Sequence, residues 1–131
     1  MRNFLKGILA MAMVTIFTLN FCGCALLLGA AAGTAGTAMW LSGKLTEVED
    51  APYAATVNAT KKSLESMNMP LKKETHTQKQ TEITSEWVDG TTVWIIVSQQ
   101  TLKSSKIQIR VGMRGDKEAS TKILDRIKKY L

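Results

Sequence analysis

The feature that most constrains this chain of 131 residues is a long uncharged segment near its start. From Gly7 to Gly43 there is no Lys, Arg, Asp or Glu, and of the 17 basic and 11 acidic residues only Arg2 and Lys6 come earlier. The residues from Lys44 to Leu131 hold all the other charges. This division excludes a uniform globular chain, and a single uncharged segment excludes a protein with many membrane spans. We therefore expect a membrane-directed segment followed by one small soluble domain.

The first 23 residues have the pattern of a secretory signal. Arg2 and Lys6 give a basic start, and the run from Gly7 to Phe21 supplies the apolar part. The run ends at Phe21-Cys22-Gly23-Cys24. This motif resembles the bacterial lipobox, which has an apolar residue, a variable one, a small one and the Cys that is lipidated. We predict a signal peptide over residues 1–23.

Cys24 is the predicted site of the lipid anchor. Its thiol would form a thioether with diacylglycerol, and the small Gly23 would let the backbone enter the peptidase that cleaves before Cys24. Cys22 is the poorer alternative, because the bulky Phe21 precedes it. An uncleaved membrane-spanning anchor is the other interpretation, since the apolar length through Leu41 suffices for one span.

Residues 24–43 form a predicted membrane-proximal tether, which is rich in Ala and Gly. Three interpretations of this segment stay open, of which one is a second complete membrane span. It can be a flexible tether against the lipid surface, or a helix whose small-residue face at Gly29, Gly33 and Gly36 binds a second copy in the membrane. Trp40 fits either the membrane interface or the start of a strand.

The charged part of the chain, residues 44–131, has alternating and helical patterns. A first strand is expected over Met39–Val48. Asp50-Ala51-Pro52 predicts the start of a helix, with Asp50 as its cap, that runs to about Met67. A second helix is expected after Asp116, with apolar residues at Ala119, Ile123, Ile127 and Tyr130.

Four further strands are predicted between the two helices. They comprise Leu71–Thr77, Lys79–Val88, Thr92–Ser98 and a strand in which Ile107, Ile109 and Val111 alternate with Lys106, Gln108 and Arg110. Asp89-Gly90 predicts a tight hairpin turn. The expected order is β-α-β-β-β-β-α, and the expected fold is an α+β two-layer sandwich, a mainly antiparallel sheet with two amphipathic helices on one face. The predicted core includes Trp94, Ile96, Ile107, Ile109 and Ile123.

These motifs form an ordered set along the chain. They are the lipobox, Trp40 with Gly43-Lys44-Leu45, Asp50-Ala51-Pro52, and Val111-Gly112 followed by Gly115-Asp116. The set resembles a family of short bacterial lipoproteins, the domain-of-unknown-function 3568 family. The resemblance covers nearly all of Cys24–Leu131. It implies location and fold, and it brings no established activity.

The sequence offers little for catalysis. His76 is the only imidazole and is expected at the surface, because no Cys is near it. Glu82 and Glu86 share one face of a predicted strand, where solvated charges are the simpler explanation. Arg114-Gly115-Asp116 spells an adhesion tripeptide, which the expected turn and helix cap already explain. Phosphate loops, nucleophile elbows and zinc spacings are absent from the sequence. We therefore expect no enzyme, cofactor or metal site.

The last helix is strongly basic. Lys122, Arg126 and Lys129 are predicted to share its outer side, where they form either a solvated surface or a contact with anionic lipid headgroups. Removal of the signal would leave 15 basic and 11 acidic residues. Nucleic acid is not an expected partner of an exported protein.

The sequence therefore predicts a non-enzymatic bacterial envelope lipoprotein. It would be held by lipid at Cys24, and its domain would bind a protein or another envelope component. Ala25 rather than Asp after the Cys favours the outer membrane, facing the periplasm. The alternative is a structural protein that self-assembles as a homo-oligomer through the glycine-rich segment.

Overall fold

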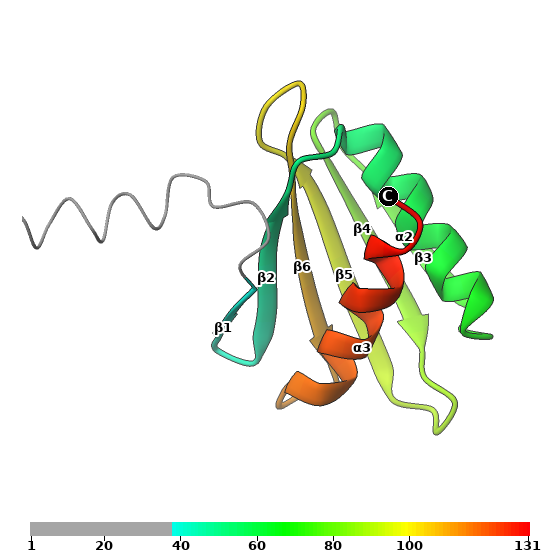
Figure 1. Ribbon diagram of the computed structural model, residues 1–131. Coiled ribbons are helices and arrows are strands. Elements are labelled where there is room, and N and C mark those ends of the chain that lie inside the picture. The colour runs from blue at the N-terminus through cyan, green and yellow to red at the C-terminus, as the bar shows by residue number, and fades with distance from the viewer. Residues whose placement is uncertain (1–37) are drawn as a thin grey trace, which may run out of the picture. The chain divides into compact units, whose positions relative to one another are not determined.

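A computed structural model describes residues 38–131, in which a six-stranded antiparallel sheet carries two helices on one face (Figure 1). The elements are β1 Met39–Leu41, β2 Lys44–Glu49, α2 Tyr53–Ser66, β3 Leu71–His76, β4 Gln80–Glu86, β5 Thr92–Gln99, β6 Ser105–Val111 and α3 Lys117–Lys128. The strand order in the sheet is β1-β2-β6-β5-β4-β3. The predicted α+β class and the two helices on one face are confirmed, with one more strand than expected.

The single strand predicted over Met39–Val48 is wrong, because a hairpin divides it into β1 and β2. Ser42 and Gly43 have positive φ angles of 51° and 75°, which close the turn between the two strands. A Cβ atom on Gly43 would lie 2.6 Å from the carbonyl oxygen of Arg114, so only Gly fits this close approach. The sheet therefore begins at Met39, within the segment 24–43 that the sequence assigned to the tether.

The helix α2 begins without the predicted side-chain cap. Pro52, not Asp50, is its N-cap residue, and no side chain makes a capping hydrogen bond to the first amides of the helix. The helix packs small polar residues on the sheet: Thr56, Thr60 and Ser63 are buried. Their hydroxyls are satisfied, since Thr60 donates to the Thr56 carbonyl at 2.8 Å and Thr56 bonds the Ser105 hydroxyl at 2.6 Å. The helix ends where the sequence predicts it to end, close to Asn68, whose φ is +54°.

The helix α3 confirms its predicted cap. Asp116 Oδ1 accepts a hydrogen bond from the Ala119 amide at 3.0 Å. Ile123 and Ile127 are fully buried, and Leu124 lies beside them. The prediction that Tyr130 extends the apolar face is wrong, because α3 ends at Lys128 and Tyr130 is exposed beyond it.

The core lies between the sheet and the two helices. Its strand residues alternate along β5 and β6, where Val93, Ile95, Val97, Ile107 and Ile109 are buried. Ile107, Ile109 and Ile123 therefore confirm their predicted core positions. Trp94 and Ile96 do not, since they point to the opposite face of the same strand. No helix within residues 38–131 is long and apolar enough to span a bilayer.

Candidate functional site

The sheet face that points away from α2 and α3, which we call the open face, carries the candidate site. Side chains alternate along a strand, so Trp94 and Ile96 lie on this face while Val93, Ile95 and Val97 lie on the helix side. The antiparallel register places Trp94 opposite Arg110 and Ile96 opposite Gln108, on the central pair of strands β5 and β6. No helix of the described part of the chain covers this face (Figure 1).

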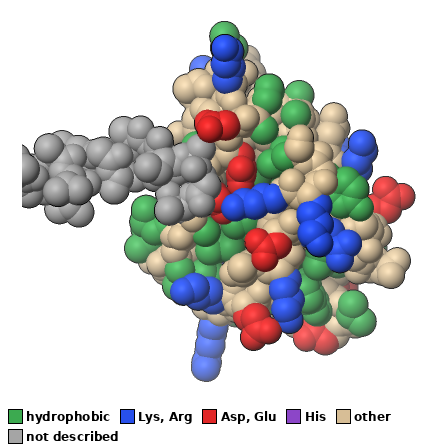
Figure 2. Space-filling model, viewed as in Figure 1, with side chains coloured by type: hydrophobic (Ala, Val, Ile, Leu, Met, Phe, Trp, Pro, Cys, Tyr) green, Lys and Arg blue, Asp and Glu red, His purple; other side chains and the backbone are tan. Residues whose placement is uncertain are grey.

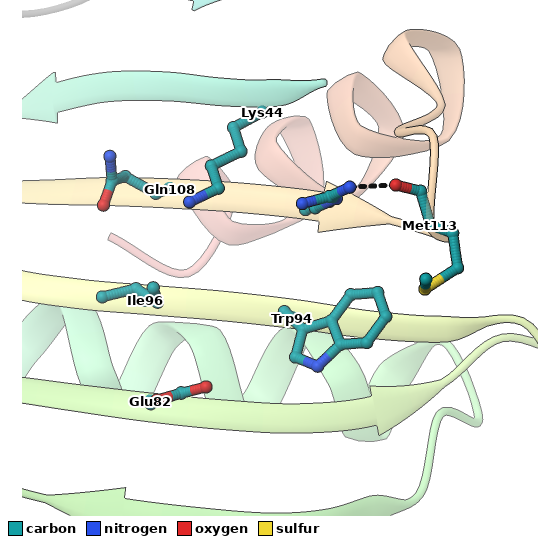
Figure 3. Close-up of a pocket in the computed structure, with 7 residues that line it drawn as sticks. Lys44, Glu82, Trp94, Ile96, Gln108 and Met113 are labelled. Atoms are coloured by element: carbon teal, nitrogen blue, oxygen red, sulfur yellow. Dashed lines mark hydrogen bonds between the residues drawn. The ribbon is translucent and has the colours of Figure 1, made fainter. Parts of the chain in front are cut away.

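A shallow concavity of about 300 Å³ lies at the centre of the open face. Four strands and the turn after β6 supply its lining, which comprises Lys44, Glu82, Trp94, Ile96, Gln108, Arg110 and Met113. Figure 3 shows Trp94 and Ile96 side by side along one strand, with Lys44 reaching over from β2 and Met113 lying above the indole. The floor is thus apolar, and the charged groups at the rim are the cations Lys44 and Arg110 and the carboxylate Glu82.

Arg110 is the best-placed side chain for contact with an anionic group. Its guanidinium donates to the carbonyl oxygen of Met113, which fixes its direction (Figure 3). Its Nε is buried and has no hydrogen-bond partner among the described residues. Because a guanidinium carries five N–H groups in a planar fork, donors remain for a ligand beside the indole of Trp94.

A second charged cluster lies under the C-terminal end of α3. Lys128 Nζ is 2.5 Å from Glu47 Oε1 and 3.6 Å from Glu49 Oε1. The Glu47 side chain is fully buried, and its Oε2 has no partner among residues 38–131. Burial, and then the neighbouring Glu47 charge, raise the pKa of Glu49. Burial works against the charge on Lys128, but the hydrogen bond and charge of Glu47 outweigh it and raise the pKa of Lys128. The cluster joins α3 to β2.

His76 belongs to a polar network between α2 and the strands β3 and β4. Its Nδ1 bonds the Thr81 hydroxyl at 2.9 Å, and its Nε2 lies 2.8 Å from Glu74 Oε1, which also pairs with Lys61 at 2.5 Å. The hydroxyl of Tyr53 also bonds Thr81. His76 is exposed, as the sequence predicts. Thr81 is completely buried, so its hydroxyl cannot reach a substrate, and the network is structural.

The basic residues predicted on α3 differ in their surroundings. Lys122 pairs with Glu118 at 3.0 Å, Arg126 is half-buried, and Lys129 is exposed just after the last residue of α3. Figure 2 shows Lys and Arg side chains interspersed with Asp and Glu on the side of the molecule that carries α3, without one continuous basic patch. Their contact with anionic headgroups stays a prediction.

The remaining sequence predictions have simple outcomes. Phe21, Cys22, Gly23 and Cys24 lie outside the described residues. Glu86 pairs with Lys72 at 3.0 Å, so the strand carboxylates Glu82 and Glu86 are not a coupled pair.

Asp89 accepts a hydrogen bond from the Thr91 amide at 2.9 Å in the predicted turn. Hydrogen bonds from the Thr91 side chain and backbone lower the pKa of Asp89. Residues 38–131 contain no group of three His, Cys, Asp or Glu side chains that could hold a metal ion.

Sequence reasoning missed the concavity. The sequence carries a signal for it, because β5 is apolar on both sides and β6 has a cationic outer side. Local patterns do not reveal that β2 pairs with β6, which brings Lys44 to the concavity, or which side of β5 the helices leave uncovered.

The fold and the site together define a class: a small α+β sandwich with helices on one sheet face and an amphipathic concavity on the other. Residues 7–130 match the model of a family described as protein of unknown function (DUF3568). Because the match spans nearly the whole sequence, the chain belongs to this family, as its motifs indicated. No curated protein matches the chain significantly.

Proposed function

We propose that this protein is a non-enzymatic lipoprotein of the bacterial cell envelope, whose sandwich domain binds a protein or another envelope component through the open face of its sheet. The lipobox supports the anchor at Cys24, with residues 1–23 as the signal peptide. The residue after it, Ala25, supports the outer membrane, with the domain facing the periplasm.

The observation that carries the binding role is the concavity on the open face. An apolar floor of Trp94 and Ile96 beside oriented cationic groups is typical of a surface that recognises a partner, because aromatic and Arg side chains supply most of the energy at interfaces. The helix side, in contrast, is filled by the core of the domain. The open face is therefore the surface that the fold leaves available for binding.

The anchor is tested by metabolic labelling with palmitate. Cys24→Ser abolishes incorporation, because a hydroxyl does not form the thioether, and the chain remains an unprocessed precursor. Cys22→Ser is the matched control two residues away, and it labels as the parent does. Equal labelling of the Cys24→Ser variant and the parent would contradict the proposal.

The binding role is tested by photo-crosslinking in intact cells. A photoreactive amino acid at position 94 captures a partner, whereas the same amino acid at the exposed position 62 on α2 does not. Capture of the same products at both positions, or at neither, would contradict a protein partner at the open face.

A further inference from the structure

One half of the open face is cationic. Lys44 of β2 and Lys106 and Arg110 of β6 point from it, since each alternates with a buried neighbour on its strand. The acidic residues of β1, β2 and β6 are Glu47 and Glu49, and both approach Lys128 on the helix side. The acidic groups of the open face, Glu82 and Glu86, lie on β4 at the other half. The strands β1, β2 and β6 thus present cations and no carboxylate on the open face, whereas on the other half Glu86 pairs with Lys72 of β3.

The same half exposes large apolar side chains. Met39 and Leu41 of β1 stand opposite Thr46 and Lys44, which places them on the open face. They are 48% and 59% exposed, and Met113 at the rim of the concavity is 79% exposed. Exposed apolar side chains among Lys and Arg, with a Trp beside them, are the composition of surfaces that enter the headgroup region of a bilayer.

The chain enters the sheet at this half. β1 is the edge strand and the first described element, and only about 14 residues separate its start from Cys24, a reach of at most about 50 Å. No charged residue occurs from Gly7 to Gly43. The linking residues 25–38 therefore carry no charge that would be repelled by an anionic lipid surface or would favour water over the membrane interface.

We infer that the β1–β2–β6 half of the open face lies against an anionic lipid bilayer. This inference rests on the proposed function, because the lipid at Cys24 brings the domain to the membrane. Lys44, Lys106 and Arg110 contact the phosphate groups, and Met39, Leu41 and Met113 enter the region between the headgroups. The basic surface of α3 is less suited to lipid contact than the open face, because its cations have acidic partners. Glu118 pairs with Lys122, and Glu47 and Glu49 pair with Lys128.

The experiment uses the full, lipidated chain reconstituted in vesicles that contain brominated lipid. Trp40→Phe with Trp87→Phe leaves Trp94 as the only indole, and Trp40→Phe with Trp94→Phe leaves Trp87, which packs against the core. In an equal mixture of phosphatidylcholine and phosphatidylglycerol, bromine quenches Trp94 more strongly than Trp87. The difference disappears in phosphatidylcholine alone.

Two charge variants, each missing three cations, separate the two basic surfaces. The open-face variant combines Lys44→Gln, Lys106→Gln and Arg110→Gln. Because each cation contributes about a fivefold preference for the anionic surface, this variant lowers the population of the membrane-contacting orientation about 100-fold at low salt. Trp94 quenching then falls to its level in phosphatidylcholine. The matched control of Lys122→Gln, Arg126→Gln and Lys129→Gln leaves quenching unchanged. An unaltered thermal midpoint shows that each variant is folded.

Each other outcome overturns the inference. If the control set abolishes quenching and the open-face set does not, α3 faces the membrane. If Trp94 is unquenched in a chain that floats with the vesicles, the open face takes a protein partner and the proposed function stands. If the chain carries no lipid at Cys24 and does not float, the proposed function fails as well.

Discussion

At the scale of single residues, the buried carboxylate of Glu47 shows how strongly one pair can hold two elements together. Its side chain has no exposure to solvent, and Lys128 from α3 is its charged partner. An uncompensated charge in this position is costly, because removal of one partner leaves the other desolvated. The pair therefore ties the last turn of α3 to the edge half of the sheet.

Replacement of the cation tests this pair. Lys128→Met lowers the free energy of unfolding by about 1–3 kcal/mol, less than for a fully buried pair because 36% of the Lys128 side chain is exposed. Adding Glu47→Met to this variant restores most of the loss. Urea denaturation of the two variants measures both effects, and a double variant less stable than the single one would refute the pairing.

The pKa of Glu49 predicts a pH dependence of stability. Because burial and Glu47 raise this pKa above 4.5, the folded state binds more protons than the unfolded state in the range above pH 4.5. The contribution of Glu49 to stability therefore falls as the pH rises through that range. Glu49→Gln removes this contribution, and its unfolding free energy varies less with pH than that of the parent. The exposed Glu65→Gln is the control, and a parent-like slope in Glu49→Gln would contradict the assignment.

At the scale of elements, the two sides of each central strand have different roles. On β6, Ile109 is buried in the core, whereas its neighbour Gln108 lines the concavity. Ile109→Ala lowers the free energy of unfolding by about 2–5 kcal/mol, because it leaves a cavity in the core. Gln108→Ala changes it by at most about 0.5 kcal/mol. Denaturation of the two variants checks the strand register, and equal losses would contradict it.

Much of the element pattern is readable from the sequence. Alternation identified β6 and its buried Ile107 and Ile109, and Asp116 marked the start of α3, because both signals depend on near neighbours in the chain. The division between β1 and β2 was not readable, since the need for Gly43 comes from the backbone of Arg114, far along the chain.

The candidate site was less predictable than the fold. Trp94 and Ile96 were assigned to the core because they are apolar, whereas their side of β5 is the one that no helix in residues 38–131 covers. The ion pair of Glu47 with Lys128 also joins residues too far apart for any local pattern. Both features depend on strand order and helix placement, which are properties of the assembled sheet.

At the scale of the whole molecule, the sandwich separates stability from recognition. The helices and one sheet face form the core, while the opposite sheet face presents Trp94 with Lys44 and Arg110 near it. The edge strand β1 begins about 14 residues after the proposed anchor in the sequence. In this account the lipid places the domain, and the open face determines what it contacts.

The central claim is that the open face is covered in the cell envelope, and cysteine accessibility tests it most directly. In this account the lipid occupies Cys24 and Cys22 leaves with the signal peptide, so Trp94→Cys introduces a single free thiol, and Lys62→Cys on α2 is its exposed control. A water-soluble maleimide is applied to isolated envelopes before and after detergent solubilisation. The account predicts slow labelling at position 94 that detergent accelerates, with fast labelling at position 62 in both conditions. Fast labelling of position 94 in intact envelopes would contradict it.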